Sequence, residues 1–190
     1  MKLYMVRHGQ SEANQNGIHS GWGDFELTPL GEAQALAVGE KLKGLVFDKV
    51  YSSDLKRAIR TQELALPGVN CERTPLLREK NVGKLVGKSF AKLTEQLGLS
   101  YVDNKREGDF SSYGGENYED FFERVQKFIK EIERSEHQNV IAFCHHGVIR
   151  LMPHFILGFK VDVTPFICHN CGIYVFEYKN SRWHLESWNA

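Results

Sequence analysis

The chain has 190 residues and a mass of 21.8 kDa, and its 24 basic residues are balanced by 24 acidic ones. This zero formal charge argues against a general nucleic-acid-binding protein, which carries a basic excess, and no stretch approaches the ~18 apolar residues of a membrane-spanning helix. With 42% hydrophobic residues the composition is that of an ordinary globular protein, and we expect one domain over residues 1–190.

The start of the sequence and the cysteines indicate a cytoplasmic protein. The apolar run of residues 1–6 is closed by Arg7, so it is too short for the core of a signal peptide. Four cysteines are too few for a disulfide scaffold, and we expect reduced thiols at Cys71, Cys144, Cys168 and Cys171.

In the first half of the chain, short apolar runs alternate with helical patterns. We predict strands over residues 2–6, 48–52 and 69–73. A helix should begin after Thr28-Pro29 and end near Gly44, and a second should be capped by Ser53 or Asp54 and end at Pro67-Gly68.

Residues 80–115 differ from the rest, and we expect an irregular lid or insertion there with one short helix over 90–97. A long amphipathic helix should follow Gly115, then a buried strand over 139–144 and a helix over 148–157 ended by Gly158. Residues 172–178 and 182–188 predict a β-hairpin. The expected fold class is therefore α/β: a three-layer sandwich with a mostly parallel central sheet, helices on both faces and a C-terminal antiparallel hairpin.

Three of the predicted strands end in residues that suit a phosphate group. Arg7-His8-Gly9 follows the first strand, Arg57 lies in the first turn of the helix after the second, and His145-His146-Gly147 follows the late strand. Ligands of open α/β sheets bind outside the carboxyl ends of the strands, so these side chains should converge. Arginine binds phosphate oxygens in a fork, and histidine can act as a nucleophile. Each of these three elements alone has an ordinary interpretation, as a loop, an exposed helix cation or a capping histidine. Together, at three separate strand ends, they predict a phosphate site.

Six motifs in order carry a family resemblance: RHGQSEAN (7–14), LTPLGEAQA (27–35), SSDLKRAIRT (52–61), LRE (77–79), GGENYEDF (114–121) and HHGVIR (145–150). The chain resembles the histidine phosphatase superfamily, also called phosphoglycerate mutase-like, and within it the small bacterial phosphatases. The resemblance implies that a phosphate monoester is hydrolysed through a phosphohistidine on His8, with Glu79 as general acid and then base. The implied catalytic set is Arg7, His8, Arg57, Glu79 and His145, and the implied phosphate-binding set is Arg7, Asn14, Arg57, His145 and His146.

The resemblance further implies a small anionic phosphate ester as substrate and no metal or cofactor; a homodimer is left open. A cofactor-dependent phosphoglycerate mutase is the alternative activity, but such mutases are longer, and a short lid leaves a phosphohistidine open to water. A catalytically silent phospho-ligand binding module is the alternative of another class. Cys168-His169-Asn170-Cys171 could suggest zinc or redox chemistry, but buried small residues before the hairpin are the simpler interpretation.

Two departures from the family pattern bear on the substrate. Position 146 usually holds a small residue, and the sequence leaves open whether His146 enters the pocket. Lysines in the lid segment, including Lys80, could favour an anionic substrate, but solvated lid lysines are the commoner explanation. His19 is likewise expected to be a solvated loop histidine.

Overall fold

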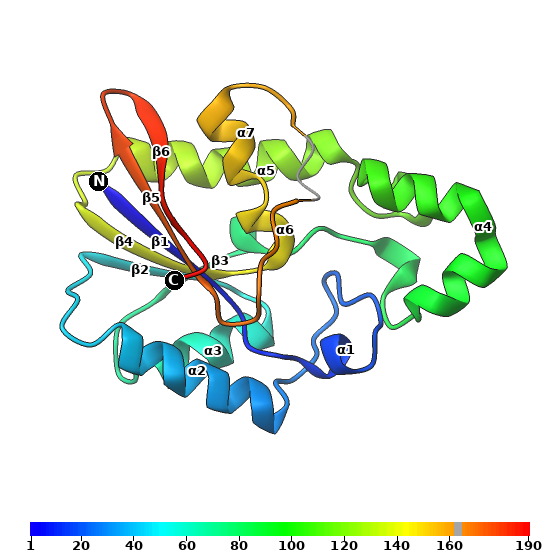
Figure 1. Ribbon diagram of the computed structural model, residues 1–190, viewed down its shortest axis with the longest axis horizontal. Helices are drawn as coiled ribbons and strands as arrows, with labels where there is room; N and C mark the ends of the chain where they lie inside the picture. The colour runs from blue at the N-terminus through cyan, green and yellow to red at the C-terminus, as the bar shows by residue number, and fades with distance from the viewer. Residues whose placement is uncertain (162–164) are drawn as a thin grey trace.

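A mixed six-stranded sheet forms the centre of the computed structural model, which describes residues 1–161 and 165–190 (Figure 1). The strand order is β3-β2-β4-β1-β5-β6. Neighbours are parallel from β3 to β1, whereas β5 runs antiparallel to both β1 and β6. The strands are β1 (Lys2–Arg7), β2 (Lys49–Ser53), β3 (Glu72–Thr74), β4 (Asn139–Cys144), β5 (Ile173–Lys179) and β6 (Arg182–Trp188).

Helices cover both faces of this sheet, as Figure 1 shows. The α-helices are α1 (Glu12–Gln15), α2 (Pro29–Lys41), α3 (Lys56–Ala65), α4 (Phe90–Glu107), α5 (Tyr118–Glu133), α6 (His146–Ile149) and α7 (Met152–Leu157). The described part of the chain also has short 3₁₀ turns, η1 (Pro75–Leu77), η2 (Gly83–Leu85) and η3 (Ser111–Tyr113). None of the helices in the described residues is long and apolar enough to cross a lipid bilayer.

Side chains alternate between two hydrophobic cores because successive residues of a strand point to opposite faces. In β1, Leu3 and Met5 pack with the apolar residues of α5 to α7, whereas Val6 packs with those of α2 and α3. The strands β4 and β5 alternate in the same way. The predicted α/β three-layer class with its C-terminal hairpin is therefore confirmed.

The start of α3 differs from the prediction. Its N-cap is Leu55, and no side chain caps it. The hydroxyl of Ser53 lies 2.8 Å from Nε2 of His145, and the carboxylate of Asp54 accepts two hydrogen bonds from Arg78, at 2.7 and 2.6 Å. Both predicted caps have tertiary partners that local sequence does not show.

The segment predicted to be irregular is largely helical. The helix expected over 90–97 is present, but α4 runs from Phe90 to Glu107 across a kink at Gly98, where φ is 59° and ψ is −141°. This segment has a small core of its own, in which Tyr101 and Phe110 are buried with Val82, Leu85 and Leu93. His19 is buried too, with Nε2 2.6 Å from the Tyr101 hydroxyl, so the prediction of a solvated loop histidine is wrong.

Two other predicted elements are shorter or divided. The strand β3 covers only Glu72–Thr74, and the helix expected over 148–157 is two helices, α6 and α7. Gly158 ends α7 in the left-handed conformation, with φ 78°, as predicted.

The packing of α5 on the sheet gives a stability prediction. Phe128 is 1% exposed and packs edge-on against Tyr51 of β2, whereas Phe159 is 63% exposed. We expect Phe128→Ala to lower the free energy of unfolding by about 3–5 kcal/mol, because it leaves a cavity in the core. Phe159→Ala, the matched control, should change it by less than about 0.5 kcal/mol. Urea denaturation measures both, and similar effects of the two changes would contradict this assignment of the core.

Candidate active site

The order of the strands brings the predicted phosphate-binding side chains together. β2, β4 and β1 are neighbours, and all three run in the same direction, so their carboxyl ends meet at one edge. His8, Arg57 and His145 are each at most 2% exposed there, and the rings of His8 and His145 lie 5.1 Å apart. The site is therefore assembled from segments far apart in the sequence.

The imidazole of His8 has one defined orientation. Its Nδ1 lies 2.7 Å from the carbonyl oxygen of Gly9, and because a carbonyl only accepts, Nδ1 carries the proton. The other nitrogen, Nε2, then keeps its lone pair and accepts a hydrogen bond from Nε of Arg57 at 3.3 Å. Burial, together with the charges of Arg57 and Arg7, holds the pKa of His8 well below its ordinary value. The ring is therefore neutral at pH 7, as a nucleophile requires.

A close approach of two glycines places this loop. A Cβ on Gly9 would collide with the carbonyl of Gly31, and one on Gly31 would collide with the carbonyl of Gln10. The amide of Gly9 also donates to the hydroxyl of Thr61 at 3.0 Å, which in turn donates to the carbonyl of Arg57. The first three motifs therefore meet directly behind His8.

The two arginines of the site are held by backbone carbonyls. Arg57 donates to Gly23 and Gly21, both at 2.8 Å, and Arg7 donates to Cys168 at 2.6 Å. Burial lowers the pKa of Arg57 to about 10, which leaves it charged at neutral pH. Both guanidiniums are thus fixed positive charges with neutral hydrogen-bond acceptors.

Among the residues that the structure describes, two buried polar atoms at this edge of the sheet have no hydrogen-bond partner: Nε of Arg7 and Nδ1 of His145. The other nitrogen of His145 lies 2.8 Å from the Ser53 hydroxyl. Burying a polar atom without a partner costs free energy. Oxygens of a bound phosphate are acceptors that would satisfy such groups.

Glu79 lies on the loop after η1 and reaches the first turn of α6. Its carboxylate accepts hydrogen bonds from the amide of Lys80 at 2.9 Å and from that of Gly147 at 3.2 Å. A Cβ at Gly147 would collide with this carboxylate, so a larger residue there would displace Glu79 from its position. The predicted acid is thereby held two residues from His145.

Two predicted phosphate ligands have more specific surroundings than the sequence showed. The amide oxygen of Asn14 accepts from the backbone of Ser11 and from Nδ2 of Asn170, which also donates to the carbonyl of His8. Asn14 therefore offers only its amide nitrogen to a ligand, and its role stays a prediction.

Burial lowers the pKa of His146 to about 4. The nearby charge of Glu79 opposes this lowering of the pKa, and the charge of Arg7 adds to it. The side chain is thus neutral and close to the site.

Sequence reasoning gave no role to several residues that position this site. Asn170 and the neighbouring cysteines are examples: Cys168 accepts from Arg7, and the amide of Cys171 donates to the carbonyl of Arg7. Both cysteines are buried and free, which confirms the interpretation as buried small residues. Among the described residues no group of three or more His, Cys, Asp or Glu side chains could hold a metal ion.

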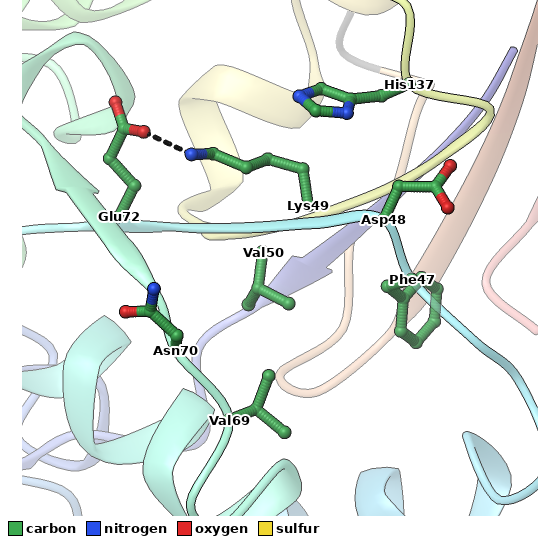
Figure 2. Close-up of a pocket in the computed structure, with 8 residues that line it drawn as sticks. All are labelled: Phe47, Asp48, Lys49, Val50, Val69, Asn70, Glu72 and His137. Atoms are coloured by element: carbon green, nitrogen blue, oxygen red, sulfur yellow. Dashed lines mark ion pairs between the residues drawn. The ribbon is translucent and has the colours of Figure 1, made fainter.

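A groove of about 680 Å³ lies elsewhere, at the amino ends of the strands (Figure 2). Lys49, the first residue of β2, lines it with His137, which precedes β4, and its ammonium pairs with Glu72 at 2.6 Å. The predicted phosphate ligands of β2 and β4 lie at the opposite ends of these strands. The groove is therefore separate from the site.

Comparisons with known proteins agree with this geometry. Residues 3–190 match the model of the histidine phosphatase superfamily, branch 1. The chain belongs to this superfamily. A broad-specificity phosphatase of Saccharomyces cerevisiae is 31% identical over 94% of this chain and 80% of its own. The crystal structure of the α-ribazole phosphatase of Shigella flexneri superposes with a TM-score of 0.90 at 26% identity, over 100% of this chain and 96% of its own.

A 2,3-bisphosphoglycerate-dependent phosphoglycerate mutase of Streptococcus thermophilus is 42% identical, but over only 54% of this chain and 47% of its own. The two relatives described above that match over most of the chain are both named as phosphatases. This member of the superfamily is a phosphatase, as the resemblance implied.

Lys80, expected to be a solvated lysine, is instead half-buried beside the site. Its ammonium donates to the carbonyl of Gly108 at 2.6 Å and lies 4.9 Å from the ring centre of Phe121. Burial lowers its pKa to about 8. The lysine thus joins the loop of Glu79 to the end of α4.

This environment predicts a pH effect on stability. Between pH 8 and the ordinary lysine pKa of about 10.4, the unfolded chain binds a proton at Lys80 that the folded chain has lost, so this residue's contribution to stability rises with pH. We expect the unfolding free energy of the wild type, minus that of Lys80→Met, to increase from pH 7 to pH 10. Urea denaturation at each pH measures this difference, and a constant or falling value would contradict the prediction.

Proposed function

We propose that this phosphatase hydrolyses small anionic phosphate monoesters through a phosphohistidine formed on His8. The observation that carries the proposal is the ring of His8, whose Nδ1 donates to Gly9 while Nε2 keeps a lone pair beside Arg57. A neutral, buried and oriented imidazole among fixed cations suits nucleophilic attack on phosphorus.

In the first step, Nε2 of His8 forms a bond to phosphorus while the bond from phosphorus to the leaving oxygen breaks. Arg7, Arg57 and His145 bind the non-bridging oxygens and offset their charge, and Asn14 and His146 donate further hydrogen bonds to them. Glu79 enters this step protonated and gives its proton to the leaving alcohol.

In the second step, the carboxylate of Glu79 takes a proton from water as the water oxygen attacks phosphorus. The phosphorus–nitrogen bond breaks, inorganic phosphate leaves, and His8 returns to its neutral form. The arginines supply the positive charge, so the proposed mechanism uses no metal and no cofactor.

We further propose that the chain is one domain in which residues 80–115 form the lid of the site and contribute to substrate choice. A cytoplasmic location and the lack of a nucleic-acid partner are supported by the free thiols and the balanced charge. A homodimer is the alternative to a monomer, and sedimentation equilibrium distinguishes the two.

The nucleophile is tested by His8→Ala, which should abolish turnover. Quenching wild-type protein soon after it meets ³²P-labelled substrate should trap an acid-labile, base-stable phosphoprotein, and His8→Ala should trap none. His184→Ala, which changes an exposed histidine of β6, is the matched control and should keep full activity. A fully active His8→Ala protein would refute the mechanism.

Hydrolysis and mutase activity are distinguished with 3-phosphoglycerate and a panel of phosphate monoesters. We expect release of inorganic phosphate from members of the panel, because the short lid leaves the phosphohistidine open to water. Conversion of 3- to 2-phosphoglycerate faster than phosphate release would favour the mutase. Binding of the esters without either reaction would favour a silent binding module.

A further inference from the structure

Arg124 of α5 holds the backbone of the loop that carries Glu79. Its Nη1 donates to the carbonyls of Leu76 and Arg78, both at 2.9 Å, and to that of Pro75 at 3.2 Å. Its Nη2 donates to the carbonyl of Glu79 at 3.1 Å. The last carbonyls of a helical turn have no partner within the turn. The carbonyl of Pro75 also accepts from the amide of Arg78 at 3.1 Å, and one guanidinium binds it together with the carbonyls of Leu76 and Arg78.

Glu116 pairs with this guanidinium and holds the other side of the loop. Its carboxylate accepts from Nε of Arg124 at 2.7 Å and from Nη2 at 2.9 Å, a two-pronged pair in which the side chains are only 14% and 13% exposed. The same carboxylate accepts from the amide of Asn81 at 2.8 Å, and the amide of Glu116 donates to the carbonyl of Asn81 at 2.9 Å. Glu79 is therefore held through the residues before and after it.

Trp22 adds a third support from a different part of the chain. Its indole nitrogen donates to the carbonyl of Glu79 at 2.7 Å, and the guanidiniums of Arg78 and Arg124 lie 4.8 and 5.7 Å from the centre of its ring. The carbonyl of Glu79 thus receives two donors while its carboxylate receives two others. Both ends of this residue are fixed.

This arrangement suits positioning better than stability alone. A buried ion pair loses much of its attraction to desolvation, and apolar residues of similar size are often as stabilising. A proton donor, in contrast, gains from a fixed position, since a displacement of about 1 Å can cost about 10²-fold in rate.

We propose that the Arg124–Glu116 pair is the positioning device of the catalytic acid. It fixes the backbone of Glu79 so that the carboxyl stays at the first turn of α6, where it can reach the leaving oxygen. Because Asn81 lies at the start of residues 80–115 and Glu116 directly follows their end, the acid and the lid share this anchor. The inference rests on the role proposed above for Glu79 and assigns how that residue is held.

The choice of leaving group tests the proposal. An alkoxide needs a proton to leave, whereas p-nitrophenolate leaves without one, so loss of the acid slows only the alkyl ester. We expect Arg124→Gln to lower kcat/KM for an alkyl phosphate about 10- to 100-fold, a part of the 10²–10⁴-fold that a general acid contributes. The loss for p-nitrophenyl phosphate should be at least about tenfold smaller. Equal losses on the two substrates would overturn the proposal.

A double-mutant cycle tests whether Arg124 acts through Glu79. In a Glu79→Gln background, Arg124→Gln should cause no further loss of kcat/KM for the alkyl phosphate, because the acid is already absent. Losses that multiply in the double variant would contradict a positioning role.

A control variant, a second test variant and a trapping measurement complete the experiment. Arg73→Gln removes an exposed ion pair with Glu63 and should leave kcat/KM unchanged. Should Arg124→Gln fail to fold by circular dichroism, Glu116→Gln keeps the size and one acceptor oxygen and is expected to show the same substrate dependence with a smaller loss. Trapping of phosphohistidine from p-nitrophenyl phosphate separates the two hypotheses: an Arg124→Gln protein that traps it but slows both esters equally would refute only the positioning role.

Discussion

The structure depends on the burial of a guanidinium beside two histidines. Arg57 is fully buried, and it donates to two backbone carbonyls and to the ring of His8. A buried charge with neutral partners is costly for stability. It also discourages protonation of its neighbours: burial comes first, and the charge of Arg57 next, among the causes that hold the pKa values of His8 and His145 well below their ordinary value. One arrangement therefore keeps the proposed nucleophile, His8, neutral and provides positive charge suited to an anion.

The proposed acid, Glu79, is held in place by a different kind of contact from the proposed phosphate ligands. Two of the proposed phosphate ligands, Arg7 and His145, stand at the ends of neighbouring strands, where the sheet sets their separation. Glu79 stands on a loop, which has no ladder of its own, and its place depends on hydrogen bonds from Arg124, Trp22 and Gly147. A site on loops needs such supporting contacts if its geometry is to be reproducible. The two halves of the proposed reaction are thus anchored by different elements, one by the sheet and one by α5 and α6, and Gly147, two residues from His145, connects them.

Much of the fold followed from local patterns. Short apolar runs predicted most strands, and the amphipathic spacing after Gly115 predicted α5, because burial on one face of a helix leaves a periodic pattern in the sequence. Only the first half of α4 was predicted from the sequence, because Gly98 interrupts the helical pattern in the middle of this helix. The caps of α3 were wrong because Ser53 and Asp54 bond to His145 and Arg78, which lie far away in the sequence.

The sequence by itself determined the family and the residues of the proposed site, because phosphate chemistry restricts which side chains can follow each strand. The sequence could not show which residues would contact those side chains and fix their positions. The hydrogen bond from Arg57 to His8, the burial of Lys80 and the lowered pKa of His146 depend on neighbours from distant segments. The contacts of Arg124 with the acid's loop depend on the packing of α5 against η1, and no short-range pattern records that packing. Only the tertiary structure decided these features, since burial and hydrogen-bond partners are properties of the folded chain.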